Sequence, residues 1–448
     1  MKGREKILFI SLGCPKNLVE SEYMLGILDQ HGYSFVSDPQ EAHTVIINTC
    51  GFIREAVEEA IDSIVEYSRM KERGIIERLF VTGCMVQRYG YKLRRELPEV
   101  DGWMGTACDP KLIIRLLGSE NGSFFIQPPT YPYEDELPRL SASPYFIAYL
   151  RISEGCSNRC TFCMIPKIKG PYRSRSIASV LNEAKRLRDR GVRELNIVSQ
   201  DTTSYGMDLR DGTCIETLLE ELIKIEGIEW IRLMYCNPSG INDRLLRLLE
   251  EEEKICPYID VPFQHVNRSV LAGMGRYVSP HPLDIVKRIR SLRRYISIRT
   301  TLMVGFPGET DNAFEELYEF VKEAEFDHLG VFIYSDEMGT RAYRYEDKIE
   351  RSIAEHRYAL IMELQREISL RKNRERIGKI YPVLIEGYSK DTELLLEGRA
   401  PFMAPEIDSK VIINRGYTDC GKIERVRIVD AFPYDLVGEI VSSESSHV

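Results

Sequence analysis

The sequence predicts an α/β protein made of three parts in order along the chain. A doubly wound parallel-sheet domain comes first, an incomplete barrel of six β/α units follows, and a small antiparallel β-barrel ends the chain. Three observations predict this architecture. Short apolar runs alternate with helical stretches on both sides of a proline-rich connector, and the stretch after Gly378 contains only short strands with turns between them. Strands that alternate with helices form parallel sheets, whereas successive short strands separated by turns form small barrels.

Composition places the chain among ordinary globular proteins. It has 448 residues, of which 43% are hydrophobic and 29% are charged, enough for about two to four domains with ample cores. The formal net charge of −9 does not favour a broad surface for phosphate groups, which bind to clustered Lys and Arg. We therefore do not expect direct RNA binding to dominate, and a basic protein partner suits the charge better.

The start of the chain and its cysteine content bear on the compartment. The run from Met1 to Lys6 leads straight into a strand, so we expect no secretory signal, and no apolar run is long enough to span a bilayer. We expect a cytoplasmic protein with no membrane partner. Eleven cysteines in such a chain favour metal or redox chemistry over a disulfide framework.

Three strands of the amino-terminal domain are each followed closely by a cysteine. The strands are Ile7–Ser11, Thr44–Asn48 and Leu79–Thr82, and the cysteines are Cys14, Cys50 and Cys84. Because the carboxyl ends of parallel strands lie on one edge of a sheet, we expect the three thiols to meet there. Any one of them alone could be an inert core residue, but three at equivalent strand ends predict a site with three thiolate ligands.

A proline-rich connector separates the first two domains. Its prolines are Pro128, Pro129, Pro132, Pro138 and Pro144. Prolines at this density interrupt both helices and strands. We therefore predict an amino-terminal domain over residues 1–122, a linker over 123–144, a barrel domain over 145–377 and a terminal barrel over 378–443.

Six repeats of strand and helix predict the incomplete barrel. Ser176 is expected to cap the helix after the first strand. In barrels of this kind the chemistry lies at the carboxyl ends of the strands. The predicted strands are Ala148–Ser153, Glu194–Ser199, Trp230–Tyr235, Tyr258–Phe263, Arg299–Gly305 and His328–Tyr334.

Three cysteines lie within eight residues directly after the first of these strands. They are Cys156, Cys160 and Cys163. Thiolates at such short spacing are the usual ligands of iron–sulfur clusters and of zinc. The spacing favours a cluster, while a zinc site with a distant fourth ligand and three unrelated core cysteines stay open as alternatives. Three protein ligands leave one metal position free for another molecule.

The final part of the chain reads as strands only. A long helix over residues 352–376 ends at Gly378, and four strands follow it. Such a small barrel either caps the structure or docks the substrate. The predicted strands are Ile380–Tyr388, Glu393–Glu397, Lys410–Asn414 and Ile423–Ala431.

The cysteine spacing resembles the signature of the radical S-adenosylmethionine enzymes, with the aromatic Phe162 just before the last cysteine. Longer runs resemble one family of these enzymes, the methylthiotransferases, over nearly the whole chain. These runs match, in chain order, the family's amino-terminal domain, its radical domain and its small terminal barrel, the TRAM domain. They are Ser11–Glu22, Asn48–Ile53, Thr82–Cys84, Gln200–Gly206, Thr301–Thr310 and Ala404–Asp408.

Two branches of this family compete. The run Leu12–Ser21 resembles the RimO branch, whereas the transfer-RNA branch usually has Gln-Met-Asn after its first cysteine. The run Asn48–Ile53 also resembles RimO rather than the Ser-Val-Arg run of the other branch. Two small departures occur: Glu20 stands where RimO sequences commonly have Asp, and Phe263 stands where a Leu is usual.

The resemblance implies a transferase that inserts a methylthio group at the β-carbon of an aspartate of protein twelve of the small ribosomal subunit. It implies S-adenosyl-L-methionine and two [4Fe–4S] clusters as cofactors, and a flavodoxin- or ferredoxin-like electron donor. No catalytic residue is assigned beyond the cluster ligands. A transfer-RNA (adenosine) methylthiotransferase and a non-catalytic iron–sulfur electron carrier stay open as alternatives. The implied ligands are Cys14, Cys50 and Cys84 for one cluster and Cys156, Cys160 and Cys163 for the other.

Further contacts to the cofactor are expected from Phe162, from Gln200 and from the turn that contains Gly305 and Gly308. A basic run follows the second cysteine set and is either a solvated loop or a device that steers an acidic group. It consists of Lys167, Lys169, Arg173 and Arg175.

Overall fold

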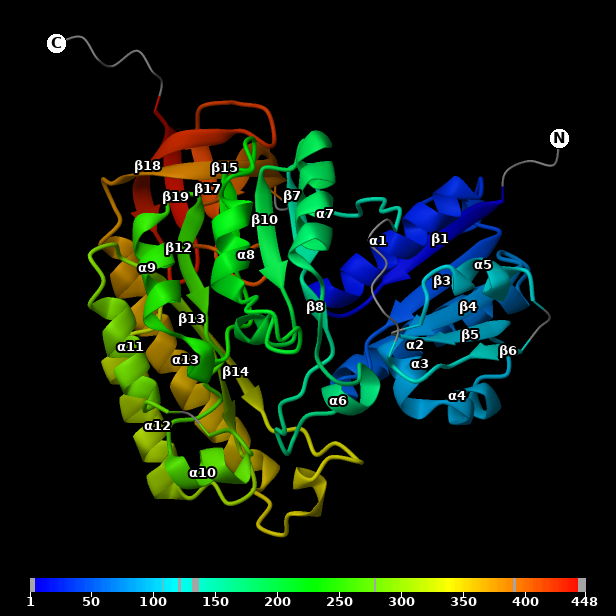
Figure 1. Cartoon of the computed structure of the whole chain (residues 1–448), viewed down its shortest axis with the longest axis horizontal. Helices are drawn as coiled ribbons and strands as arrows, with labels where there is room; N and C mark the ends of the chain where they lie inside the picture. Colours follow the sequence, from blue (N-terminus) through cyan, green and yellow to red (C-terminus); the bar gives the residue numbers. More distant parts are fainter. Residues whose placement is uncertain are drawn as a thin grey trace.

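Six parallel strands form the amino-terminal sheet among the residues that the structure describes, which are 5–106, 108–119, 122–130, 137–277, 279–389 and 392–441. The structure is a computed structural model, shown in Figure 1. The strand order β2-β1-β3-β4-β5-β6 makes β1, β3 and β4 direct neighbours. Three short strands, β2, β5 and β6, were not predicted. The elements are β1 (Lys6–Ser11), α1 (Pro15–Gln30), β2 (Ser34–Phe35), η1 (Pro39–Glu41), β3 (Thr44–Thr49), α2 (Arg54–Glu72), β4 (Arg78–Gly83), α3 (Cys84–Tyr89), α4 (Tyr91–Glu96), β5 (Gly102–Gly105), α5 (Leu112–Leu117) and β6 (Ser123–Phe125).

Six further parallel strands of the described chain form an open, curved sheet in the order β14-β13-β12-β11-β10-β7, which confirms the incomplete barrel. Helices cover its outer face (Figure 1), where alternate strand residues such as Leu195 and Ile197 pack against them. Ser176 caps α7 as predicted, since its hydroxyl accepts from the amide of Ser179 at 3.1 Å. The elements are β7 (Ile147–Arg151), β8 (Ser153–Glu154), α6 (Ile165–Ile168), β9 (Arg173–Ser174), α7 (Ile177–Asp189), β10 (Glu194–Val198), η2 (Thr202–Ser204), α8 (Ile215–Leu222), β11 (Trp230–Leu233), η3 (Pro238–Gly240), α9 (Asp243–Glu251), β12 (Ile255–Asp260), α10 (Arg268–Gly273), α11 (Pro282–Arg290), β13 (Ser297–Val304), α12 (Asp311–Ala324), β14 (His328–Ile333) and η4 (Ala342–Arg344).

A long helix, α13 (Arg351–Arg374), leads to the terminal barrel. Within the described residues this barrel closes with five strands in the order β15-β16-β17-β19-β18. The pairing of β17 with β19 is parallel and the others are antiparallel. The fifth strand, β19, was not predicted. The strands are β15 (Ile380–Ser389), β16 (Thr392–Arg399), β17 (Val411–Arg415), β18 (Ile423–Ala431) and β19 (Leu436–Ile440).

Pro132 of the connector lies outside the described residues. Among the helices of the described ranges, none combines the length and the apolar character that crossing a lipid bilayer requires.

The amino-terminal domain packs through α1 against the edge strand β7 of the open barrel (Figure 1). Buried polar groups join the two. Arg139 of the connector pairs with Glu22 of α1 at 2.5 Å and with Glu183 of α7 at 2.7 Å, and the hydroxyl of Tyr23 donates to Glu183 at 2.9 Å. Burial alone would raise the pKa of Glu183, but Arg175 and Arg139 lower it to about 2. The charged side chains at this junction are therefore buried, and each lies against a partner of opposite charge.

The terminal barrel covers the amino ends of the strands of the open barrel. Arg399 pairs with Glu194, the first residue of β10, at 2.6 Å, and Arg232 of β11 pairs with the same carboxylate at 2.9 Å. All three side chains are at most 2% exposed. Arg299 and His328, near the starts of β13 and β14, contact Asp408 and the carbonyl of Phe402. The terminal barrel therefore lies at the end opposite to the loops that carry Cys156–Cys163.

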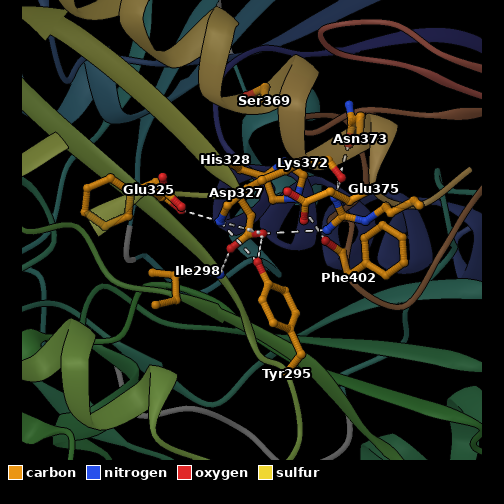
Figure 2. A network of polar contacts seen from close by, with 12 residues as sticks. Tyr295, Ile298, Glu325, Asp327, His328, Ser369, Lys372, Asn373, Glu375 and Phe402 are labelled. Atoms are coloured by element: carbon orange, nitrogen blue, oxygen red, sulfur yellow. Dashed lines mark hydrogen bonds and ion pairs between the residues drawn. The ribbon is translucent and has the colours of Figure 1, made fainter. Parts of the chain in front are cut away.

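A second polar network fastens α13 to the same end of the barrel (Figure 2). At its centre the buried carboxylate of Asp327 accepts from Lys372 at 3.2 Å, from the amide of Ile298 at 3.0 Å and from the hydroxyl of Tyr295. The side-chain amide of Asn373 donates to the carbonyl of Phe432 in the terminal barrel at 3.0 Å. Helix α13 thus contacts both the open barrel and the terminal barrel.

Candidate functional site

The three cysteines of the amino-terminal domain lie at the carboxyl ends of three adjacent strands. Cys14 follows β1 and precedes α1, Cys50 follows β3, and Cys84 is the first residue of α3 directly after β4. The strands pair in parallel with one another in the order β1-β3-β4. The sheet therefore brings the three thiols to one edge, as the sequence predicted.

A close backbone approach sets the distance between the first two of these cysteines. Gly13 has a φ of +93°, and a Cβ built there would lie 2.8 Å from the Cβ of Cys50 and 3.2 Å from its sulfur. Any other residue would clash and would also be strained at this φ. Gly13 thus allows the loop that carries Cys14 to lie directly against Cys50.

The surroundings of this set affect the ionisation of its thiols. Burial raises the pKa of Cys50, and it raises the pKa of Cys84 to about 12. The charge of Lys169 acts in the opposite direction on Cys84, while the neighbouring thiols raise its pKa further. Without a metal Cys50 and Cys84 are protonated at neutral pH, so binding a metal as thiolates would release protons.

The second set lies on the loop between β8 and α6, at the carboxyl end of the open barrel. The amide of Cys156 donates to the carbonyl of Gly170 at 3.0 Å, and the amide of Ile165 donates to the sulfur of Cys163 at 3.4 Å. Burial raises the pKa of Cys156 and raises that of Cys163 to about 12. Cys160 lies between them on the same loop, so the three thiols belong to one segment of eight residues.

The donor types in both sets fit an iron–sulfur cluster, since each set offers three thiols, one of them buried and two half-buried. As the side chains lie, no three His, Cys, Asp or Glu of the described ranges stand in the geometry that holds a metal ion. The fit thus rests on the type and grouping of the donors.

A buried ionic network lies between the two sets. The ammonium of Lys169 lies 2.6 Å from the carboxylate of Glu20 and 3.5 Å from that of Glu154, and it donates to the hydroxyl of Thr106. Arg151 pairs with Glu154 at 2.7 Å. Glu20 follows Cys14 on α1, whereas Glu154 lies two residues before Cys156. The network therefore ties the backbone of one set to that of the other across the domain boundary.

The sequence pointed only weakly to this network. Glu20 stood out as a departure from the commoner Asp, and Lys169 belonged to the basic run. Lys169 and Arg175 of that run are at most 3% exposed, so a wholly solvated loop is the wrong interpretation. Charged partners that come from distant segments leave no local pattern, and Glu154 and Thr106 were missed for that reason.

The other predicted contacts lie around the second set. Phe162 is partly buried and meets Phe306 edge to face, with ring centroids 6.5 Å apart. Gly305 has a φ of +76° and lies against α13, where a Cβ would come within 2.6 Å of Ala354. Gln200 is half-buried, and Gly308 has open space beside it. Their contacts with a cofactor stay predictions.

A hydrogen bond that was not predicted supports the loop that carries the second cysteine set. Asn158, between Cys156 and Cys160, donates to the carboxylate of Asp201 at 2.7 Å. The same carboxylate accepts from Asn237 at 3.1 Å. Asp201 follows β10, so two barrel loops hold the cysteine loop in place.

Three protein-family models match the chain. The uncharacterized protein family UPF0004 matches residues 6–105, the radical SAM superfamily matches residues 150–321, and the TRAM domain matches residues 377–441. The three matches fall on the three parts of the fold in the same order.

Curated relatives match the chain over nearly its full length. Proteins called ribosomal protein uS12 methylthiotransferase RimO are 46% identical in Pelobacter propionicus, with 98% of both chains covered, and 45% identical in Geobacter sulfurreducens, with 98% of this chain and 99% of that one covered. The protein of that name from Bdellovibrio bacteriovorus is 43% identical, with 98% of both chains covered.

Solved structures share the fold at low identity. A radical S-adenosylmethionine methyltransferase from Kitasatospora setae, TsrM, with cobalamin and a [4Fe–4S] cluster bound, matches with a TM-score of 0.53 and 15% identity over 74% of this chain and 75% of that one. The same enzyme with tryptophan and a S-adenosylmethionine analogue bound gives 0.54 and 14% over 73% and 72%. At this identity the likeness concerns the fold alone.

Proposed function

The chain belongs to the family of ribosomal protein uS12 methylthiotransferases called RimO, and from this premise we propose that it adds a methylthio group to the β-carbon of an aspartate of that ribosomal protein. The observation that supports this most strongly is the full-length similarity, which covers both cysteine-bearing domains and the terminal barrel. The enzyme is then a radical S-adenosylmethionine transferase of sulfur-containing groups.

We propose that Cys156, Cys160 and Cys163 hold one [4Fe–4S] cluster and that Cys14, Cys50 and Cys84 hold a second. When bound, the first cluster with S-adenosyl-L-methionine supplies the radical chemistry that activates an unactivated C–H bond, and the second supplies the sulfur. Each set has three thiols and so leaves an iron free for another ligand. All six of these cysteines are free thiols, as such ligation requires.

The residues around the cysteines hold and orient them. Asp201 holds the second cysteine loop through Asn158, at 2.7 Å. Lys169 lies against the buried carboxylates of Glu20 and Glu154. The segments that carry the two cysteine sets can therefore pack together without an unpaired buried charge. Fixed placement of the two centres and the substrate within reaction distance is the protein's main contribution to such chemistry.

The partners and compartment follow from the same proposal. A ribosomal protein substrate is basic, which suits a chain with a net charge of −9. We propose a flavodoxin- or ferredoxin-like electron donor and a cytoplasmic location, where ribosomal proteins are found. We also propose the division into residues 1–122, 123–144, 145–377 and 378–443 as the domain boundaries.

The experiment is a comparison of substrates. The protein is reconstituted anaerobically with iron and sulfide, reduced, and incubated with S-adenosylmethionine and either small ribosomal subunits or bulk transfer RNA. Mass spectrometry should find a methylthio group on an aspartate of the ribosomal protein and none on the RNA. A variant with Cys156, Cys160 and Cys163 all changed to Ala is the control and should modify neither.

Two outcomes would overturn the proposal. Modification of RNA alone would assign the chain to the transfer-RNA branch. Failure of the reduced, iron-loaded protein to cleave S-adenosylmethionine at all would leave a non-catalytic cluster protein.

A further inference from the structure

One loop of the barrel domain contacts both cysteine-bearing segments. It follows β14, the last strand of the open barrel, and spans residues 335–342. The loop lies on the side of the barrel where the sheet is not closed, since β14 and β7 are the two edges of the sheet. Its contacts differ from those of the Lys169 network and were not predicted.

On one side the loop binds the amino-terminal domain through Glu337. One carboxylate oxygen accepts from the backbone amide of Arg54, at the start of α2, at 2.7 Å, and the other pairs with Arg88 at 2.6 Å. Arg88 also donates to the carbonyl of Gly51 at 2.9 Å. Gly51 follows Cys50, and Arg88 lies one helical turn after Cys84 on α3. A single carboxylate thus holds the backbones next to two of the three cysteines.

On the other side the same loop binds the segment of the second cysteine set. The ammonium of Lys167 donates to the carbonyl of Gly339 at 2.6 Å. The amide of Ala342 donates to the carbonyl of Thr161 at 2.9 Å. Thr161 stands between Cys160 and Cys163. The two segments are therefore linked through six residues of one loop, from Glu337 to Ala342.

The charged contact is the strong part of this link. The side chains of Arg88 and Glu337 are 4% and 7% exposed. Removing one partner of a buried ion pair leaves the other charge buried without compensation, which is among the most damaging single changes. A negative charge is also favoured at the amino end of α2, where Glu337 lies. Few alternative arrangements of the two domains would satisfy Arg88, Arg54 and Glu337 at once.

We infer that Glu337 is a positioning residue: it fixes the first cysteine set relative to the second, and so sets the spacing between the centre that activates the substrate and the centre that supplies the sulfur. The inference rests on the proposed function for its chemical meaning, but the contacts stand without it. Misplacement by about an ångström can cost on the order of a hundredfold in rate. We call the contacts of Glu337 with Arg88 and with the amide of Arg54 the clamp. Loss of the clamp should therefore allow cofactor cleavage to occur without methylthio transfer.

The test compares Glu337→Gln with Asp336→Asn. In the first variant one carboxylate oxygen becomes an NH2 group, so the side chain can accept from Arg88 or from the amide of Arg54 but not from both, and the charge is lost while the size is kept. Asp336 is the neighbouring carboxylate of the same loop, and it binds Tyr334 at 2.9 Å and Lys348, both within the barrel domain. This matched variant removes a charge without touching the amino-terminal domain.

Two readouts are needed. In the full-length protein without clusters, amide hydrogen exchange over residues 51–58 and 84–89 should be about tenfold faster in Glu337→Gln and unchanged in Asp336→Asn. In the iron-loaded protein, the number of S-adenosylmethionine molecules cleaved per substrate modified should rise about tenfold in Glu337→Gln alone.

The outcomes separate this inference from the proposed function. Unchanged exchange in Glu337→Gln overturns the clamp whatever the activity. Faster exchange with an unchanged cleavage ratio shows a merely structural contact and overturns the positioning role. If the wild-type protein transfers no methylthio group, the proposed function fails, and the exchange measurement still decides on the clamp.

Discussion

At the scale of single residues, the thiols of the first set owe their proximity to backbone placement. Cys14, Cys50 and Cys84 come from segments far apart in sequence, and three adjacent parallel strands bring them to one edge. Gly13 permits the close approach of its loop to Cys50, because a Cβ at this position would clash with that residue. Replacement of a cysteine should consequently remove a proposed cluster ligand while leaving this backbone arrangement in place.

Replacing each cysteine set in turn should separate the two clusters. The reconstituted wild type should contain about eight iron atoms per chain, and each triple Ala variant about four. The variant of Cys14, Cys50 and Cys84 should keep cofactor cleavage and lose sulfur insertion, because the second set is intact. Iron analysis and quantification of cleaved cofactor check this. An iron content that does not fall in this variant would contradict the assignment of the first set.

The stability of the domain junction should depend on pH through Glu183. Its pKa is lowered from 4.5 to about 2 in the folded protein, so its contribution is complete above about pH 4.5 and is lost as the pH falls towards 2. This shift corresponds to about 3 kcal/mol at neutral pH. The stability gap between wild type and Glu183→Gln should therefore be about 3 kcal/mol at neutral pH and about 2 kcal/mol at about pH 3.5.

Urea unfolding of the protein without clusters, followed by circular dichroism at several pH values, measures this gap. Glu221→Gln is the matched control, since the carboxylate of Glu221 lies on the surface of α8, and surface pairs contribute little. It should show almost no gap at any pH. A gap for Glu183→Gln that widens as the pH falls would refute the sign of the prediction.

The sequence was informative about some site residues and silent about others for a physical reason. The spacing of Cys156, Cys160 and Cys163 is local, so it could be recognised directly. The contact between Arg88 and Glu337 joins residues that are 249 positions apart, and neither residue has a distinctive neighbourhood. The packing of the two domains brings such partners together. The hydrophobic periodicity of the sequence reports single helices and strands and carries no information on that packing.

At the scale of elements, long regular segments were predictable and short ones were not. The apolar runs of β3 and β4 identified these strands directly, and the predicted Ser176 cap coincides with the start of α7. Strands β2 and β6 have only two and three residues, too few for any alternation to appear. They are strands because the neighbouring β1 and β5 offer free edges, which is a property of the sheet.

The terminal barrel should be attached to the open barrel chiefly through Arg399. Changing Arg399 to Met leaves Glu194 with Arg232 alone, at 2.9 Å, and leaves part of that carboxylate without its partner. Removing one member of a buried ionic group typically costs about 3–5 kcal/mol. The variant should unfold at lower urea concentration and should be cleaved more readily by protease near residue 378.

Arg427→Met provides the comparison, because Arg427 is an exposed arginine of β18 in the same barrel. Surface substitutions of this kind usually change stability by less than about 0.5 kcal/mol. Equal unfolding midpoints for the two variants would mean that the buried group does not hold the barrels together.

At the scale of the whole molecule, the terminal barrel lies at one end of the open barrel, and α6, which follows the second cysteine set, lies at the other (Figure 1). The sequence left open whether the terminal barrel caps the structure or docks the substrate. The buried contacts of Arg399 and Arg299 with the barrel support a cap. A docking role needs the outer surface of the terminal barrel, away from these contacts.

Truncation after Gly378 should therefore damage folding as well as any docking. It would uncover the amino ends of the strands of the open barrel and leave Glu194 and Arg232 without Arg399. We expect the truncated protein to be largely insoluble, or to melt well below the full-length chain in a thermal shift measurement. A truncated protein with wild-type stability would show that the barrel does not depend on its cover.

The contact of Arg399 with Glu194 also has a consequence for synthesis on the ribosome. Glu194 and Arg232 emerge from the exit tunnel long before Arg399, about 205 residues later in the first case. Both cysteine sets are translated earlier still, so the segments that carry them exist while the barrel is incomplete. Chains that end before residue 399 lack the arginine that pairs with Glu194. The open barrel of such chains should be unstable, and proteases should degrade them.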